Sequence, residues 1–367
     1  MKKKTEYIYT VIVAAVLIFG LSFWAVLKPA DDFSESERRP LEKLPELSVK
    51  TLLNGDFMEN FEDYTNDQFP MRDTFRSVKA LAQYYLFGLK DNNGLYYADG
   101  QIAMLDFPLD EESLDYAKER FDYLYETYMK NKVNKVVFSM VPDKGFYLGE
   151  ENGYPVMDYA AMEEYFEENL DFAEYVSITD LLDKDDYYAA DTHWQQQSIT
   201  APAEKILGAL GARPFDDLSE ETATENFHGV YYGQSALPLA PEKITYLRNE
   251  ELDSMTVMNY ETGKTGGIYD FGKLEGKDPY EFYLSGSVSI LEVSNPNAEG
   301  DRHLIIFRDS FGSSIAPLLM RDYAKITLID TRYIIPATIG NYVDFEGADV
   351  LMIYSSLVLN DSYLFKK

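Results

Sequence analysis

The chain has 367 residues, enough for one main domain with an appended segment, and its formal charge at pH 7 is −30. This charge argues against nucleic acid and against an anionic lipid surface as partners of the exposed domain, because both would repel it. The sequence contains no cysteine, which removes disulfide bonds and cysteine-bound metals as explanations of its fold or chemistry.

Residues 1–30 are predicted to be a cytoplasmic stub followed by a transmembrane anchor. Three lysines at positions 2–4 precede a nearly uncharged run over residues 7–27. At about 1.5 Å per residue this run spans roughly 30 Å, the thickness of a bilayer's hydrocarbon core. The lysines favour a cytoplasmic N-terminus, which predicts a single-pass protein of the cell membrane with an extracytoplasmic C-terminal domain. A cleaved signal peptide is the alternative, although the run is long for one.

Residues 31–105 are predicted to form a stalk and an N-terminal helical segment. Charged residues and prolines punctuate residues 31–50, as in a stalk that leads away from a membrane. Aromatic and aliphatic residues follow with helical spacing over residues 52–89, which predicts a helix with a buried aromatic face that includes Phe61, Phe75 and Tyr85. Beyond it, an Asp-Gly pair at 99–100 predicts the turn of a β-hairpin.

Residues 106–367 show the pattern of an α/β domain. Buried strands are predicted over residues 135–141, 175–178, 304–307, 325–329 and 350–354, and helices over residues 111–130, 160–169 and 198–210. Strands that alternate with helices predict a three-layer α/β/α fold around a parallel sheet. Residues 212–298 have short alternating runs instead, which predicts a β-rich insertion beside the pocket. Sites in such sheets lie at the carboxyl ends of strands.

An aspartate and a histidine are two positions apart in the segment Asp-Thr-His-Trp at 191–194. In extended backbone both side chains project to one side, so Asp191 can fix the tautomer of His193 and stabilise its protonated form. A lone Asp-x-His is more often a structural hydrogen bond or part of a metal site. A metal site is a weak interpretation here, because the only other histidines, His228 and His303, are not paired at ligand spacing.

A serine lies where a predicted strand turns into a predicted helix. Residues 303–307 form the strand, Ser310 falls on the turn and the helix begins at Phe311. Such a turn presents a nucleophilic hydroxyl to the base His193, and the amides of Ser310, Phe311 and Gly312 can face a developing oxyanion. Taken alone, a serine here is more often a turn residue, and Asp309 is most simply a helix N-cap.

Three further side chains are predicted to contact the substrate. Tyr188 and Trp194 are candidate walls of the pocket, with ordinary packing as the alternative. Arg308 comes just before the serine turn, where it can pair either with a substrate carboxylate or with an acidic neighbour.

Several short motifs recur along the chain in a fixed order. They lie at residues 37–41, 45–48, 57–58, 67–73, 191–194, 227–229 and 308–311. Together they resemble the DHHW family of bacterial membrane-anchored extracytoplasmic proteins, itself similar to alginate O-acetyltransferase proteins with an SGNH-hydrolase-like domain. Two positions depart from the pattern. Thr192 replaces the first histidine of the eponymous motif, and Leu-Ser-Gly-Ser-Val at 284–288 stands where relatives have Gly-Gly-Asn-His, which removes an asparagine oxyanion donor.

The resemblance implies an O-acyltransferase, in particular an O-acetyltransferase, that modifies an extracytoplasmic polysaccharide through an acyl group on Ser310. It implies no cofactor and no metal. Acetyl-CoA does not reach the outside of a cell, so the resemblance also implies a membrane-bound O-acyltransferase partner as acyl donor. Two alternatives stay open, a carbohydrate esterase with the same triad and a non-catalytic glycan-binding or scaffold protein of the cell envelope.

Overall fold

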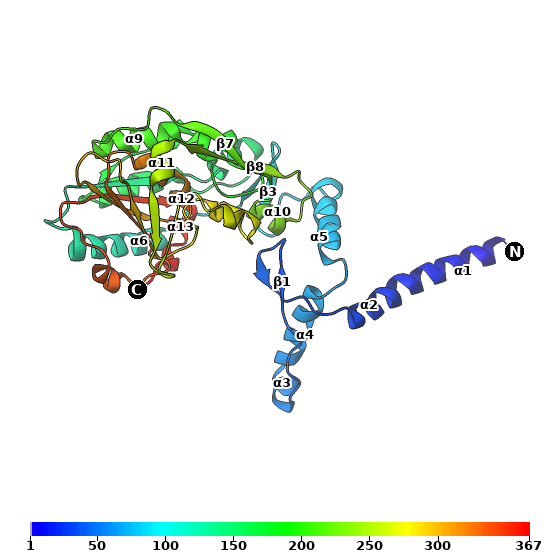
Figure 1. Ribbon diagram of the computed structural model, residues 1–367. Coiled ribbons are helices and arrows are strands. Elements are labelled where there is room, and N and C mark those ends of the chain that lie inside the picture. The colour runs from blue at the N-terminus through cyan, green and yellow to red at the C-terminus, as the bar shows by residue number, and fades with distance from the viewer. Residues whose placement is uncertain (1) are drawn as a thin grey trace. The chain divides into compact units, whose positions relative to one another are not determined.

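The computed structural model describes residues 2–367 (Figure 1). The chain folds into two compact units. The first contains the residues up to Leu89 together with residues 233–238, and the second contains residues 90–232 and 239–367.

The first unit begins with a continuous helical run, made of α1 (Lys2–Ala15), a π-helical turn (Val16–Gly20) and α2 (Leu21–Leu27). Within it, residues Tyr7–Leu27 form a helix of 21 residues that is long and apolar enough to cross a membrane. A signal sequence near the N-terminus has the same length and composition. One N-terminal apolar helix, signal or anchor, is therefore present.

The helix predicted over residues 52–89 is broken into shorter pieces. The first unit contains β1 (Phe33–Ser34), β2 (Arg39–Pro40), α3 (Val49–Asn54), α4 (Asp56–Asp67) and α5 (Arg72–Leu81). Gly55 separates α3 from α4 with φ of 90°, and Met71 precedes α5 with φ of 56°. These breaks rotate the aromatic positions away from a common stripe, and Phe61, Phe75 and Tyr85 are 38%, 45% and 68% exposed. The prediction of a buried aromatic face was wrong.

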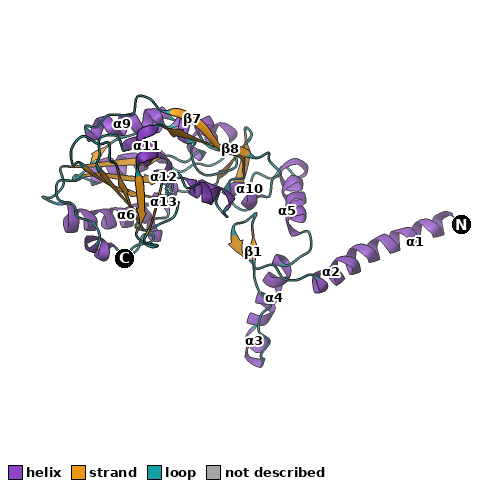
Figure 2. Cartoon of the chain, in the orientation of Figure 1, coloured by secondary structure: helices purple, strands orange, loops and turns teal. Residues whose placement is uncertain are grey.

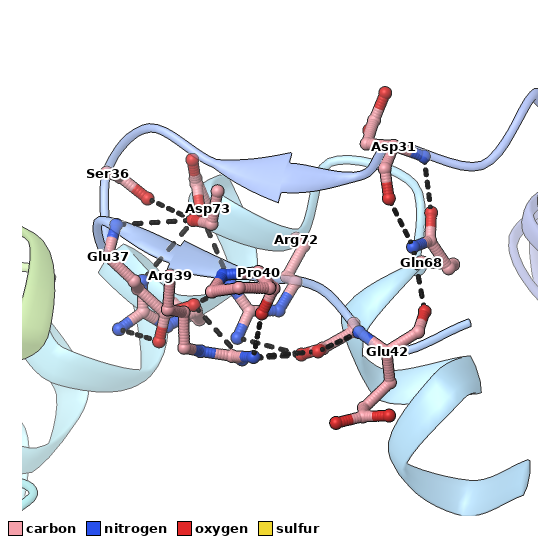
Figure 3. Close-up of polar contacts among 12 residues, drawn as sticks. Asp31, Ser36, Glu37, Arg39, Pro40, Glu42, Gln68, Arg72 and Asp73 are labelled. Carbon is pink, nitrogen blue, oxygen red and sulfur yellow. Dashed lines mark hydrogen bonds and ion pairs between the residues drawn. The ribbon is translucent and has the colours of Figure 1, made fainter. Parts of the chain in front are cut away.

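A polar network ties the segment after the apolar helix to the end of α4 (Figure 3). The Arg39 guanidinium donates to both carboxylate oxygens of Asp67, at 2.8 and 2.6 Å, and holds the pKa of that carboxyl below its usual value. The Gln68 amide group exchanges two 2.9 Å hydrogen bonds with the backbone of Asp31. Such paired contacts are stronger and more directional than single ones. Two motifs that are separate in sequence, at 37–41 and 67–73, therefore belong to one structure.

The second unit is built on an eight-stranded sheet in the order β10-β9-β11-β13-β12-β14-β5-β6. The strands are β5 (Lys135–Val141), β6 (Glu174–Tyr175), β9 (Thr256–Asn259), β10 (Lys264–Gly266), β11 (Ile290–Ser294), β12 (His303–Arg308), β13 (Lys325–Ile329) and β14 (Asp349–Ser355). From β13 to β6 neighbouring strands are parallel, and β11, β9 and β10 add antiparallel pairs. The sheet is thus mostly parallel, and three strands of the predicted insertion 212–298 extend it.

Helices cover both faces of this sheet (Figure 2). The main ones are α6 (Glu111–Leu124), α8 (Tyr159–Asn169), α9 (Thr200–Leu210), α12 (Phe311–Ile315) and α13 (Ser356–Asn360). Successive side chains of a strand point to opposite faces. Val137 of β5 accordingly packs with Ile206 of α9, whereas Phe138 packs in a second apolar cluster with Phe121 of α6 and Phe166 of α8.

Smaller elements complete the second unit. The predicted hairpin is confirmed as β3 (Leu95–Ala98) and β4 (Gln101–Met104), with positive φ at both Asp99 and Gly100 as a tight hairpin turn requires. The other elements are α7 (Gly145–Leu148), β7 (Ser219–Phe227), β8 (Glu242–Arg248) and α11 (Glu250–Ser254), while α10 (Val230–Ser235) runs from this unit into the first. Strands β7 and β8 pair with each other as a separate antiparallel ribbon.

The pKa of His303 predicts how stability depends on pH. Burial lowers this pKa to about 4, and the ring lies 2.8 Å from Thr327 Oγ1. The unfolded chain, with an ordinary histidine pKa of 6.5, binds more protons between pH 6.5 and 4. Folding stability must therefore fall as the pH falls through that window, by at most about 3 kcal/mol from this group. In urea titrations at several pH values, His303→Gln should lose less stability than the native protein over this range, and equal losses would contradict the assignment.

Candidate active site

Three side chains of the second unit form a continuous hydrogen-bonded line. His193 Nε2 lies 2.8 Å from Ser310 Oγ, and His193 Nδ1 lies 2.5 Å from Asp191 Oδ1. Asp191 and His193 are buried, and Ser310 is half-buried. The other carboxylate oxygen of Asp191 accepts a 2.7 Å hydrogen bond from the Val230 amide. A carboxylate held in this way orients the imidazole and leaves Nε2 to act on the serine hydroxyl.

Asp191 and His193 lie side by side for a different reason from the one expected. Residues 191–193 form a bend, and the prediction of extended backbone was wrong. The His193 amide donates to Asp191 Oδ1 at 3.0 Å, which closes the bend and brings the imidazole against the same oxygen. The two side chains therefore meet because of a local hydrogen bond from backbone to side chain, and not because alternate residues of a strand point to the same face.

Ser310 occupies a sharp turn between β12, which ends at Arg308, and α12, which begins at Phe311. Asp309 fixes this turn, because its carboxylate accepts from the Phe311 amide at 2.9 Å and from the Ser355 amide at 2.7 Å. The Asp309 carboxylate thus binds an amide of the first helical turn as expected, but the N-cap position itself belongs to Ser310, so the prediction of Asp309 as the N-cap was wrong. Gly312 lets the turn close, since a Cβ there would stand 2.5 Å from Arg308 Cβ.

Two of the three amides predicted to hold an oxyanion already have acceptors. The Phe311 amide donates to the Asp309 carboxylate, and the Gly312 amide donates to the Asp309 carbonyl at 3.2 Å. In this structure neither is offered to a ligand, because the carboxylate of Asp309 occupies the first amide and its backbone carbonyl occupies the second. Within residues 2–367, we find no protein acceptor for the Ser310 amide, which remains the candidate donor.

The three predicted substrate contacts are fully buried, which argues for supporting roles. Trp194 donates its indole N–H to Ser314 Oγ at 2.8 Å, and Tyr188 packs edge-on against Phe227. Arg308 donates to the Gly286 carbonyl at 2.9 Å, and its guanidinium lies 3.8 Å from the Asp330 carboxylate. Tyr188 and Trp194 are therefore packing residues, and Arg308 pairs with an acidic neighbour. None of the three side chains has exposed surface for a substrate.

Sequence reasoning missed Tyr280, which stacks on the histidine. The two rings lie 3.8 Å apart with planes 8° from parallel, and the Tyr280 hydroxyl hydrogen-bonds Ser314 Oγ at 2.7 Å. Ser314 thereby joins Trp194 to Tyr280, and the stacked ring of Tyr280 holds His193 in place. No local signal marks Tyr280, because it lies in an irregular part of the predicted insertion and reaches the site only through tertiary packing.

Sequence reasoning also missed a buried lysine and a half-buried glutamate that hold the segment before Asp191 by hydrogen bonds. Lys144 Nζ donates to the carbonyls of residues 188 and 189 at 2.7 and 3.1 Å. The Glu242 carboxylate accepts from the amides of residues 189 and 190 at 2.7 and 2.9 Å. Burial lowers the pKa of Lys144 to about 7 and raises the pKa of Glu242. Lys144 follows the carboxyl end of β5, a position that could have marked it.

Comparison with known proteins gives likenesses of fold. Neither a family model nor a curated protein matches the sequence. Among solved structures, a DHHW family protein from Eubacterium siraeum is similar, with a TM-score of 0.60 and 19% identity over 73% of this chain and 93% of that one. Bacillus cereus PatB1 with a sulfonyl adduct aligns with a TM-score of 0.58 and 16% identity, over 74% of this chain and 98% of PatB1.

A more distant likeness is to the O-acetyltransferase domain of Pseudomonas putida AlgJ, with a TM-score of 0.42 and 11% identity over 68% of this chain and 84% of that one. The predicted resemblance to the DHHW family is confirmed as a structural similarity. At these identities the likeness to the DHHW protein and to PatB1 shows a shared α/β fold with a mostly parallel sheet.

The crowding at Gly312 predicts that Gly312→Ala disturbs the serine turn. The added methyl group meets Arg308 Cβ, so we expect a loss of about 1–3 kcal/mol in the free energy of unfolding. Labelling of Ser310 by a fluorophosphonate, followed by mass spectrometry, should slow at least tenfold. Gly208→Ala is the matched control, because a Cβ there meets no atom within 4 Å and the helix should gain about 0.5–1 kcal/mol. Unchanged labelling of Gly312→Ala would contradict this account of the turn.

The hydrogen bonds that Lys144 donates predict that Lys144→Met slows the fluorophosphonate labelling of Ser310. This change leaves the carbonyls of residues 188 and 189 without their donor, at a cost of about 1–3 kcal/mol, and loosens the segment that leads to Asp191. Thermal unfolding and the labelling rate measure the two effects. The control is Lys184→Met, which removes a partly exposed lysine paired with Asp99. Equal labelling rates for both variants would show that Lys144 does not position the catalytic side chains.

Proposed function

We propose that this chain is an O-acyltransferase, in particular an O-acetyltransferase, that modifies a cell-envelope or secreted polysaccharide through an acyl-serine intermediate. The observation that carries the proposal is the line of hydrogen bonds from Ser310 through His193 to Asp191, at 2.8 and 2.5 Å. An aligned nucleophile, base and orienting carboxylate is the arrangement that acyl transfer requires.

The first half of the reaction forms the acyl-serine. His193 Nε2 accepts the hydroxyl proton of Ser310 as Oγ attacks the carbonyl carbon of an acyl donor. Asp191 accepts from Nδ1–H and stabilises the imidazolium, while the Ser310 amide donates to the negatively charged oxygen of the tetrahedral intermediate. When this intermediate collapses, His193 returns the proton to the leaving group, and the acyl group stays on Oγ.

The second half uses the same groups in reverse. A sugar hydroxyl gives its proton to His193 Nε2 and attacks the acyl carbonyl, and the collapse of the new intermediate returns that proton to Ser310 Oγ. Water in place of the sugar would give hydrolysis. The proportion of transfer to hydrolysis depends on how well a bound acceptor excludes water.

The fold comparisons are consistent with this chemistry. PatB1, which shares the fold, has been obtained with a sulfonyl adduct. A sulfonyl group is an electrophile that an activated serine hydroxyl attacks, and we expect Ser310 to react with sulfonyl fluorides in the same way.

The proposal also assigns the other parts of the chain. Residues 1–30 would be the cytoplasmic stub and single-pass anchor, residues 31–105 the stalk and helical segment, and residues 106–367 the extracytoplasmic catalytic domain. The Tyr7–Leu27 helix supports the anchor by its length and composition. A membrane-bound O-acyltransferase would then supply acyl groups from the cytoplasm, and the anchor would keep the two proteins adjacent.

Intact mass spectrometry after exposure to an activated acetyl ester tests the proposal. The native protein should gain one acetyl group, mapped to Ser310, whereas Ser310→Ala should gain none and His193→Ala should react at least a hundredfold more slowly, since a general base contributes about 10²–10⁴ in rate. Ser313→Ala is the control, because it removes a buried hydroxyl of the same turn that has no part in the line.

Addition of an oligosaccharide to the acetylated protein separates the enzyme classes. Acetyl groups that pass to the sugar support a transferase, and acetate released to water supports an esterase. A folded native protein that never acetylates at Ser310 would overturn both and favour a non-catalytic envelope protein.

A further inference from the structure

We infer that Arg76 of the first unit is a positioning residue for the catalytic carboxylate, an inference that rests on the proposed function. It acts through residues 229–242, which we call the connecting loop. This loop leaves the second unit, contributes residues 233–238 to the first unit and returns to the second unit at β8. Its two ends hydrogen-bond the segment that contains Asp191, and Arg76 holds its tip.

The first end of the connecting loop lies directly against Asp191. The Val230 amide donates to Asp191 Oδ2 at 2.7 Å, and the Tyr232 amide donates to the Ala190 carbonyl at 3.1 Å. Gly229 permits this approach, because a Cβ there would stand 2.2 Å from the Ala190 carbonyl oxygen and 2.4 Å from Asp191 Cβ. Any shift of this end of the loop therefore changes the position or the hydrogen bonding of the carboxylate that orients the imidazole.

The second end of the connecting loop holds the same segment. The carboxylate of Glu242, the last residue of the loop, accepts hydrogen bonds from the amides of residues 189–190. Near the first end, the buried ring of Tyr231 lies 5.4 Å from Lys144 Nζ, which itself donates to two carbonyls of the segment. The residues that lead to Asp191 are thus held from both ends of the loop.

The tip of the connecting loop, Gly233 and Gln234, is bound by the first unit. Arg76 Nη2 donates to the Gly233 carbonyl at 2.8 Å and to the Gln234 carbonyl at 3.3 Å. Gly233 also lies close against Ser36, because a Cβ at residue 233 would stand 1.5 Å from the Ser36 carbonyl oxygen. Hydrogen bonds from a charged donor are stronger than those between neutral groups, so these contacts fix the tip.

Helix α10 joins the tip to the first end of the loop. It contains both Val230 and Gly233, which are three residues apart and so lie within one turn of helix. The backbone of a helical turn moves as a body, because its hydrogen bonds fix the dihedral angles of successive residues. A displacement of the Gly233 carbonyl is therefore passed to the Val230 amide, roughly 4.5 Å away along the helix axis, and so to Asp191.

Glu37 holds Arg76 in turn. Its carboxylate lies 3.1 Å from the Arg76 guanidinium and also forms ion pairs with Arg72 at 2.5 Å and with Arg39 at 3.3 Å (Figure 3). The Arg76 side chain is largely buried, so salt screens its pair with Glu37 less than it screens a pair at the surface. A network of several charges restricts an arginine more than a lone exposed ion pair does.

This arrangement gives a role to two sequence motifs that the proposed reaction leaves unused. The motif at residues 37–41 begins with Glu37, which holds Arg76. The motif at residues 227–229 ends with Gly229, whose lack of a side chain lets the loop approach Asp191. Both motifs therefore act on the position of one carboxylate.

Loss of the Arg76 hydrogen bonds should slow acylation without weakening the binding of the acyl donor. Arg76 acts on the reaction through the loop and Asp191, and Asp191 supports proton transfer to His193 rather than donor binding. Misplacement by about 1 Å at a catalytic contact can cost about a hundredfold in rate. The maximal rate should therefore fall while the half-saturating concentration of the donor stays the same.

Acetylation of Ser310 by p-nitrophenyl acetate, followed by intact mass spectrometry of the whole chain in detergent, tests this inference. We expect Arg76→Met to lower the maximal rate about tenfold, at an unchanged half-saturating ester concentration and an unchanged final extent of acetylation. Arg76→Lys should recover part of the rate, because an ammonium group can still donate to the Gly233 carbonyl. Gly233→Ala, which pushes the tip away from Ser36 and leaves Arg76 in place, should slow acetylation as Arg76→Met does.

Gln68→Met is the matched control. It removes the hydrogen bonds of another buried side chain of the first unit, which run to the backbone of Asp31 and Glu42, and it should keep the native acetylation rate. An equally slow Gln68→Met would overturn the inference, because any loosening of the first unit would then suffice. Native rates in both Arg76→Met and Gly233→Ala would overturn it as well, as would a lower final extent of acetylation at an unchanged rate, which marks unfolded protein.

Amide hydrogen exchange separates this inference from the proposed function. In Arg76→Met, peptides that contain residues 189–191 and 229–232 should exchange at least tenfold faster than in the native protein, while β12 and β14 stay as protected as before. If Ser310 of the native protein never acetylates, the proposed function fails, and faster exchange at these residues still supports positioning by Arg76. Unchanged exchange there would overturn the positioning role even where Ser310 acetylates.

Discussion

The hydrogen bond between His193 Nε2 and Ser310 Oγ joins residues 117 positions apart, and much of the second unit serves to keep its length at 2.8 Å. On the serine side, the hydrogen bonds of the Asp309 carboxylate and the absence of a side chain at Gly312 close the turn. On the histidine side, Asp191 and the stacked ring of Tyr280 fix the imidazole. An error of about 1 Å at such a contact can cost a hundredfold in rate, so each support bears on chemistry as well as on stability.

Buried ionisable side chains collect at the carboxyl edge of the sheet, where they bind backbone groups or an opposite charge. Arg308 ends β12, Asp330 follows β13, and Lys144 follows β5 by three residues. A buried ion is costly unless several hydrogen bonds replace its water, which explains why Lys144 takes two carbonyls and Asp309 two amides. These bonds restrict the loops that carry Asp191 and Ser310, because a shifted loop would lose them.

Prediction of the fold from sequence succeeded where the signal was local. The strand predicted over residues 135–141 is β5 with the same bounds, and the hairpin turn at Asp99–Gly100 follows from two residues that tolerate positive φ. It failed where pairing partners are distant in sequence. Residues 212–298 were predicted to be a β-rich insertion beside the pocket, but the sequence did not reveal that β9, β10 and β11 join the main sheet, because alternation of side chains does not show which edge a strand will pair with.

The same division applies to the candidate site. Motif chemistry alone named Asp191, His193 and Ser310, because a carboxylate, an imidazole and a turn hydroxyl have recognisable local contexts, and the fold brings them together. Only the tertiary structure decided that the Phe311 and Gly312 amides are already bound, that Trp194 is fully buried with its indole N–H on Ser314, and that Tyr280 stacks on the imidazole. Residue types and their spacing determine what a side chain can do, whereas burial and the choice of hydrogen-bond partner depend on segments that are far apart in the chain.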